Sequence, residues 1–233
     1  MENNVRAVNA FVESIRFNLE NSNDVAAPKN KVPLATVSRE FGANGSKTAE
    51  QLAKRMGVKC YGYTLLNSIV DTLKSNRHLT QLFDEKFADS TNSWFLSLFS
   101  GGKGSKDEYL RCLFKAVTVI ARNGGVIIGR GAHLILANDP SVFRVKIEGS
   151  MDRCAKRIAE REGIDAEAAK ARIYKTESER KEYVREIYKL MPTDRSYYDL
   201  VINSDHLKSA QMVDIIVFAM EQRGLPISMT PTT

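Results

Sequence analysis

The sequence predicts an α/β protein built on a parallel sheet with helices on both faces. Short apolar, β-branched runs alternate along the chain with segments in which apolar residues recur at three- and four-residue steps. This alternation is typical of parallel strands joined by crossover helices. One run, GVIIG at 125–129, is apolar on both faces and too short for a helix, so it predicts a central strand.

The chain is expected to begin with an appended amphipathic helix. Residues 3–20 place Val5, Val8 and Val12 on one helical face, and the polar, proline-containing stretch NSNDVAAPKNK follows. We assign 1–31 to this helix and its linker, and 32–233 to the main domain. The helix is expected to dock on its own domain or on a second copy, which would make a homodimer.

Within the main domain, five strands and three helices are expected, and two longer excursions interrupt them. The expected strands are LATVS, VKCY, GVIIG, VFRVKIE and DLVIN, and the expected helices span 46–56, 64–74 and 107–122.

Two segments interrupt the alternation and are expected to cover a site. Residues 75–106 are helical in pattern but broken by the SGGKGSKD loop, which we interpret as a flexible hinge. Residues 151–191 form a charge-dense helical stretch interrupted near Gly163. Both are placed where mobile covers of an active site lie. We assign no role to the tail from Leu225.

Composition excludes several classes of protein. No apolar stretch approaches the roughly 20 residues that cross a bilayer, and the N-terminal region is charged, so we expect no membrane association. Three widely spaced cysteines predict neither disulfides nor a zinc site, which suits the cytoplasm. The net charge of +6 suits an anionic ligand. It does not by itself indicate nucleic acid, and we expect no such partner.

The stretch FGANGSKTAEQLA predicts a phosphate-binding loop. Polyphosphate is held by backbone N–H groups of a glycine-containing turn and by a helix N-terminus, and this stretch offers both after the strand LATVS. The strict pattern G-x-x-x-x-G-K-[ST] is not met, so an ordinary capped turn remains the alternative. The candidate ligand-binding residues are Gly42, Ala43, Asn44, Gly45, Ser46, Lys47 and Thr48.

The segment GVIIGRGAH carries a second candidate. Arg130 follows a strand, and in open α/β sheets ligands bind beyond the carboxyl ends of strands. Gly129 and Gly131 are expected to leave room for a phosphate group that the guanidinium grips with two hydrogen bonds. The alternative is an internal ion pair that caps the sheet.

The charge-dense segment is a third candidate. Arg153, Arg157 and Arg161 lie on one helical face, and phosphoryl transfer needs cations around the transferring group. Interleaved carboxylates make a solvated helix the alternative for any single arginine. We expect one or two of the cations to reach the site. Further cations in this segment are Arg172, Lys175, Arg180, Arg185 and Arg195.

Hydrolase chemistry finds no support in the sequence. Ser38 ends a strand without a G-x-S-x-G elbow, and His78, His133 and His206 have no nucleophile or metal ligand at an informative spacing.

Four ordered blocks resemble the cytidylate kinase-like family of P-loop NTPases. They are VSREFGANGSKTAEQLAKRMGVKCYGYTLL, GVIIGRGAHLIL, FRVKIEGSMDRCAKRIAEREGI and YYDLVINSDHL. The resemblance implies a nucleotide-binding excursion at about 61–115 and a lid at about 151–196. It implies ATP- and Mg²⁺-dependent phosphorylation of a nucleoside monophosphate, with CMP or dCMP as the acceptor, and Arg130 matches the arginine that holds the acceptor's phosphate.

The candidate catalytic groups are therefore Lys47, Arg130, Arg157 and Arg161, with Thr48 as the candidate Mg²⁺ contact. Two departures from the family pattern matter. Lys47 lies about two positions late when the downstream helix is aligned, and Gly62 stands where the family has aspartate. The alternatives are a nucleotide-binding regulatory protein with a degenerate phosphate loop, or a kinase of another small acceptor.

Overall fold

A computed structural model of the 233-residue chain describes residues 32–76, 105–189 and 194–227. The expected helix at 3–20 and the hinge glycines at 101–104 lie outside these residues. The chain divides into two compact units. One combines Val32–Cys60 with Gly124–Thr233, and the other combines Met1–Lys31 with Tyr61–Asn123.

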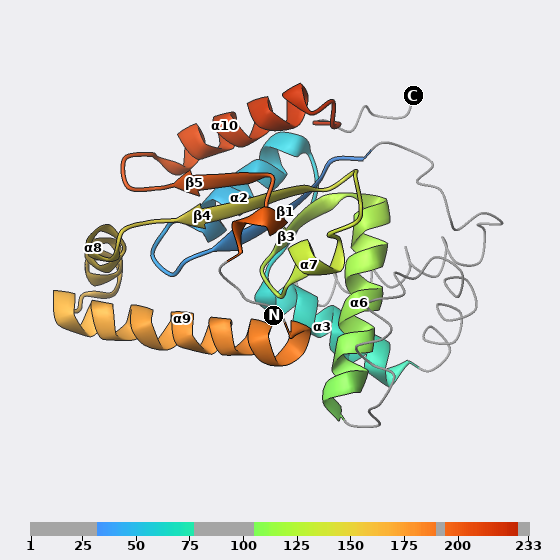
Figure 1. The fold of residues 1–233 in the computed structure, drawn as a ribbon, viewed down its shortest axis with the longest axis horizontal. Coiled ribbons are helices and arrows are strands. Elements are labelled where there is room, and N and C mark those ends of the chain that lie inside the picture. Colours follow the sequence, from blue (N-terminus) through green and yellow to red (C-terminus); the bar gives the residue numbers. More distant parts are fainter. Residues whose placement is uncertain (1–31, 77–104, 190–193, 228–233) are drawn as a thin grey trace. The chain divides into compact units, whose positions relative to one another are not determined.

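Five strands form a single sheet in the order β2-β3-β1-β4-β5 (Figure 1). β1 pairs in parallel with β3 and with β4, and β4 pairs in parallel with β5. The predicted α/β class, with a parallel sheet covered by helices, is confirmed. The strands are β1 (Leu34–Arg39), β2 (Cys60–Tyr61), β3 (Gly125–Ile128), β4 (Phe143–Glu148) and β5 (Leu200–Asn203).

Burial of the strands follows their place in the sheet. All four residues of β3 are buried, which confirms GVIIG as a central strand. β4 alternates buried and half-buried residues, because successive side chains point to opposite faces of a strand.

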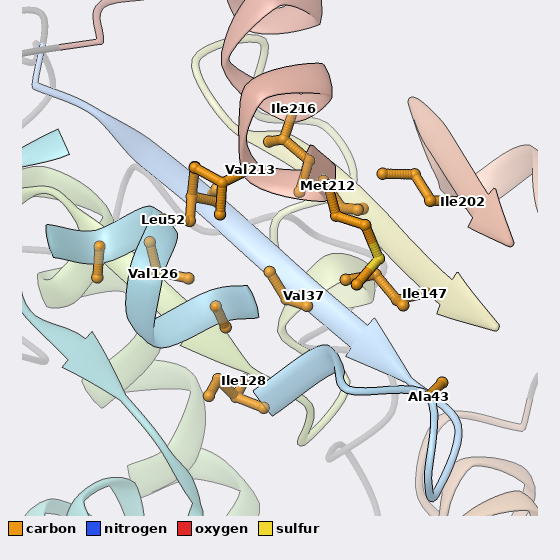
Figure 2. Close-up of a cluster of buried hydrophobic side chains, with 14 of the residues drawn as sticks. Val37, Ala43, Leu52, Val126, Ile128, Ile147, Ile202, Met212, Val213 and Ile216 are labelled. Atoms are coloured by element: carbon orange, nitrogen blue, oxygen red, sulfur yellow. The ribbon is translucent and has the colours of Figure 1, made fainter. Parts of the chain in front are cut away.

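The helices α2 (Gly45–Met56) and α10 (Ser209–Gln222) pack together and cover one face of this sheet. α2 was expected from 46 to 56, whereas α10 was not predicted from the sequence. Figure 2 shows Leu52 of α2 and Met212, Val213 and Ile216 of α10 meeting side chains from the strands in one cluster. All four are at most 4% exposed, so this cluster fixes α2 against β1 and positions the loop between them.

The segment after β4 folds into two helices. α8 (Met151–Glu162) and α9 (Ala166–Tyr188) pack against each other, and Gly163 ends α8 in the left-handed conformation with φ of 68°. The predicted helical break near Gly163 is confirmed. Ser150 and Asp165 accept hydrogen bonds from backbone N–H groups and cap the two helices.

Two short helices connect the remaining strands. α7 (Ala132–Ile135) follows β3, and the 3₁₀ helix η1 (Arg195–Tyr197) precedes β5. Neither was predicted, because elements of three or four residues are too short to give a periodic signal.

The described part of the second unit is a helical pair. α3 (Tyr63–Ser75) and α6 (Ser105–Asn123) pack together, and the Tyr109 hydroxyl donates to Oδ1 of Asn67 at 3.1 Å. Both helices were expected, within two residues at each end. No helix in the described part of the chain is long and apolar enough to span a bilayer.

The strand order predicts a ligand site at the carboxyl end of β1. The chain leaves β1 toward β2 on one side, and it leaves the neighbouring β4 toward β5 on the other side. Ligands of open α/β sheets bind where the connections diverge in this way. The site is therefore expected among the residues that follow β1, β3 and β4.

Candidate phosphate-binding site

The loop between β1 and α2 presents unpaired backbone donors at a helix N-terminus. It turns through Gly42 at φ 87° and Asn44 at φ 60°, and asparagine tolerates this left-handed conformation. The N–H groups of Gly45, Ser46 and Lys47 make no hydrogen bond to any described residue. Together with the helix dipole, these three groups favour an anion.

Neighbouring atoms leave no room for a side chain at the two loop glycines, Gly42 and Gly45. A Cβ atom at Gly42 would lie 2.8 Å from the carbonyl oxygen of Cys154 on α8, in addition to the strain of positive φ. A Cβ atom at Gly45 would collide with Cβ and Cγ of Arg39. The loop therefore requires glycine at both positions for contact reasons that its sequence does not reveal.

The turn after β3 is a run of three left-handed residues. Gly129, Arg130 and Gly131 have φ of 69°, 54° and 69°. An arginine in this conformation costs about 1 to 2 kcal/mol, and such strain concentrates at functional sites.

The two flanking glycines make room for protein side chains, whereas room for a phosphate group was expected. A Cβ atom at Gly129 would lie 2.5 Å from Nη1 of Arg39, and one at Gly131 would collide with the ring of Tyr188. The two Cβ positions are thus filled by Arg39 and Tyr188, and the role of Arg130 itself stays a prediction. These contacts join residues far apart in the sequence, so the local pattern could not show them.

The helix α9 lies across the ends of β1 and β3 and brings four side chains onto these turns. Its Tyr188 hydroxyl donates to the carbonyl of Arg130 at 2.6 Å. The guanidinium of Arg130 lies over the Tyr183 ring, 5.1 Å from its centroid. The other two side chains are Glu177 and Arg180.

Glu177 and Arg180 contact the phosphate loop itself. The Phe41 N–H donates to Oε1 of Glu177 at 2.9 Å, and Nη1 of Arg180 donates to the same oxygen at 2.6 Å. Arg180 also donates to the carbonyl of Arg39 at 3.1 Å. One N–H group of the loop therefore already donates to a carboxylate, which shows that this position can bind an anionic oxygen.

Arg39 lies among other charged groups in this region. Burial, followed by the nearby guanidinium groups of Arg180 and Arg130, lowers the pKa of Arg39 to about 10, and Glu177 opposes the shift. Arg180 pairs with Glu177, whereas Arg39 makes no ion pair with a described residue. A bound anion such as a phosphate would stabilise the charge of Arg39.

Two of the predicted loop residues differ in burial. Lys47 is exposed, and Thr48 is fully buried with its hydroxyl donating to the Asn44 carbonyl at 3.0 Å. The buried hydroxyl is bonded within the loop, and the role of Thr48 as a Mg²⁺ contact stays a prediction. The described residues hold no cluster of three or more His, Cys, Asp or Glu that could bind a metal ion.

The guanidinium of Arg157 is not free, because it is bonded to oxygen atoms of the loop and of the segment after β5. Its Nη1 donates to the carbonyl of Gly42 at 3.2 Å and to Oγ of Ser204 at 3.1 Å, and its Nη2 donates to the carbonyls of Ser204 and Asp205. These bonds tie the phosphate loop to the residues after β5. They do not support the prediction that Arg157 is catalytic.

Arg161 is exposed and lies beside the loop. Its Nη2 donates to Oε1 of Glu162 at 2.8 Å, and its guanidinium lies 5.7 Å from the centroid of the Phe41 ring. The predicted role of Arg161 stays a prediction.

A buried imidazole that the sequence left without a role links three elements. Nδ1 of His133 lies 3.2 Å from Oγ of Ser38, and its Nε2 lies 3.1 Å from the hydroxyl of Tyr198. Burial, with Arg144 and Lys146 nearby, lowers the pKa of His133 to about 3. The imidazole is therefore neutral near pH 7, and it connects the end of β1 to the segment before β5.

The lowered pKa of His133 predicts acid sensitivity of the fold. The unfolded chain binds a proton near the ordinary pKa of 6.5, whereas folded His133 binds one only near pH 3, so stability falls as pH decreases between these values. His133→Gln should reduce the loss of unfolding free energy between pH 7 and pH 5 by about 2 kcal/mol in urea titrations. The exposed His206→Gln is the control. Identical losses in native protein and His133→Gln would contradict the assignment.

Taken together, the loop, the α2 N-terminus and the nearby guanidinium groups form a candidate phosphate-binding site on a parallel α/β sheet. A match to a family model identifies the family of the chain. The model of the cytidylate kinase-like family matches residues 35–206, and the chain belongs to this family.

Individual relatives agree with this assignment. The chain is 32% identical to a cytidylate kinase of Methanopyrus kandleri over 110 residues, which are 43% of this chain and 57% of that enzyme. The match thus spans little more than half of that relative. A cytidylate kinase of Thermoplasma acidophilum is 23% identical over 197 residues, which cover 84% of this chain and 96% of that enzyme.

A solved structure shares the fold. An uncharacterized protein of Eubacterium ventriosum superimposes with a TM-score of 0.62 at 22% identity, over 81% of this chain and 98% of the other. At this identity the similarity shows the fold alone.

Proposed function

We propose that the protein transfers a phosphoryl group from ATP to a nucleoside monophosphate, with CMP or dCMP as the acceptor. The observation that carries the proposal is the pair of turns at the carboxyl ends of β1 and β3, on which α9 places further cationic and aromatic side chains. Membership of the cytidylate kinase-like family and the named activity of its relatives support the choice of reaction and acceptor.

The protein's own contribution would be binding and charge stabilisation. Phosphoryl transfer requires the donor and acceptor oxygens to be held in line while negative charge spreads over the transferring group. The α2 N-terminus would hold the ATP phosphates, and Arg130 would hold the acceptor's phosphate. Tyr183 and Tyr188 would fix the guanidinium and the backbone of Arg130, so that little reorganisation accompanies transfer.

Magnesium accompanies ATP in such reactions, where it is held largely by phosphate oxygens and water. Because the hydroxyl of Thr48 is buried and bonded to the Asn44 carbonyl, we derive no step through the metal. Ser46, the neighbouring hydroxyl of the α2 N-terminus, is exposed.

The test is ADP release from ATP and Mg²⁺ with CMP, dCMP, UMP, AMP and GMP as separate acceptors. We expect turnover with CMP or dCMP and, without an acceptor, ADP release at least about 100-fold slower, because water lacks the binding contacts of the correct acceptor. Turnover only with a different small acceptor would keep the transferase and reject the substrate. ATP binding without turnover on any acceptor would favour a regulatory protein.

A further inference from the structure

Arg39 ends β1 and fills the position where a side chain on the first residue of α2 would lie. In the strict phosphate-loop pattern the lysine stands at the start of the helix that follows the loop. Here α2 starts at Gly45, and a Cβ atom at that position would collide with Cβ and Cγ of Arg39. The aliphatic part of Arg39 therefore occupies the place that a lysine side chain at residue 45 would need.

The guanidinium of Arg39 points away from the core of α2 and toward the end of β3. Its Nη1 lies against Gly129, which adjoins Arg130. The carbonyl of Arg39 is held by Arg180, and the pKa of Arg39 responds to Arg130, Arg180 and Glu177. The guanidinium is thus located between the loop after β1 and the turn after β3, both of which belong to the same compact unit.

This guanidinium makes no ion pair or hydrogen bond with any described residue, and its Nε atom is buried without an acceptor. A half-buried cation without a partner is unfavourable, because it loses water without gaining an anionic acceptor. Arg130 and Arg180 add repulsion. A charge retained under these conditions is consistent with an anionic ligand that completes its hydrogen bonds.

We propose that Arg39 replaces the phosphate-loop lysine and binds the ATP phosphates from the end of β1. The inference rests on the proposed function for the identity of the nucleotide. The sequence candidate Lys47 is exposed, whereas Arg39 lies beside the unpaired N–H groups of the α2 N-terminus. Arginine reaches further than lysine and binds phosphate through two parallel hydrogen bonds, which suits a cation that starts one loop earlier in the chain.

The first experiment measures ATP and CMP binding separately by calorimetry on the full chain. In Arg39→Met, the long apolar side chain keeps the packing against Gly45 and removes the charge. We expect ATP affinity to fall on the order of 10- to 100-fold and CMP affinity to change less than about twofold, because charge-assisted hydrogen bonds to phosphate are lost. The control is Arg55→Met, an exposed arginine on α2 that pairs with Asp214.

Thermal unfolding separates this effect from misfolding. Removing an unpaired half-buried charge should leave the melting temperature of Arg39→Met equal to or above that of the native protein. Unchanged ATP affinity in Arg39→Met would overturn the proposal, and so would a loss of affinity in Lys47→Met of the same size. A native protein that binds ATP through Arg39 but phosphorylates no acceptor would refute the kinase and leave the Arg39 assignment standing.

A double variant tests whether the two side chains share one position. Arg39→Gly removes both the Cβ and the Cγ atoms that collide with a Cβ atom at Gly45, and residue 45 lies in a helix without positive φ. Arg39→Gly with Gly45→Lys should regain at least about tenfold of the ATP affinity that Arg39→Gly loses, because the lysine restores a charge-assisted contact to phosphate. An equal loss in the single and double variants would contradict the replacement.

Discussion

Arg130→Ala is expected to lower kcat/KM for the monophosphate acceptor on the order of 100-fold, because the acceptor's phosphate loses a charged, bidentate partner. The guanidinium is oriented by the Tyr183 ring, and its backbone is held by the Tyr188 hydroxyl. Arg130→Lys should not restore activity, since an ammonium group cannot make the two parallel bonds or the same stacking contact. Steady-state kinetics with CMP and with dCMP measure the effect.

The control for this prediction is Arg185→Ala. Arg185 is an exposed arginine on α9, the helix that also carries Tyr183, and its side chain makes no hydrogen bond or ion pair with a described residue. ATP affinity of Arg130→Ala should stay close to that of the native protein, which separates the acceptor side of the site from the donor side. Native kcat/KM in Arg130→Ala would show that the acceptor's phosphate binds elsewhere.

Gly131→Ala is expected to destabilise the fold by about 3 kcal/mol or more, from backbone strain together with overpacking. The new methyl group would collide with the ring of Tyr188, which is 1% exposed and cannot move into solvent. Any shift of Tyr188 also breaks its hydrogen bond to the carbonyl of Arg130. Urea titration at equilibrium measures the loss of unfolding free energy.

Gly163→Ala provides a matched comparison. Gly163 has φ of 68°, against 69° for Gly131, but no atom lies within 4 Å of a Cβ built there. Its substitution should therefore cost only the backbone strain, about 1 kcal/mol. Equal losses in the two variants would show that the contact between residue 131 and Tyr188 does not determine stability.

The sequence predicted the sheet because each strand carries its own signal. GVIIG is apolar on both faces, and all four residues of β3 are buried in the sheet. The helices α2 and α9 were also predictable, since their apolar spacing and the glycine at 163 are local features. The short α7 and η1 have no such periodicity and could not be found this way.

The site was only partly predictable, because its contacts are long-range. The sequence indicated the loop and Arg130, but Tyr188 contacts Arg130 across 58 residues and Glu177 contacts Phe41 across 136. Arg39 lies two residues before the predicted loop FGANGSKTAEQLA and was not a candidate, because the strict pattern places its cation after the glycines. The gap at Gly45 was the available signal: a glycine where the pattern needs a long side chain implies that another chain segment fills the space.

The carboxylate of Glu177 already accepts a hydrogen bond from the Phe41 N–H, at one end of the predicted phosphate loop. A phosphate oxygen that bound this amide would compete with the carboxylate, so occupancy of the loop and detachment of Glu177 would be linked in a single equilibrium. Arg180 would then exchange its carboxylate partner for the phosphate. The helix α9 would thus carry an internal competitor of the ligand, and part of the intrinsic affinity for phosphate would be used to displace it.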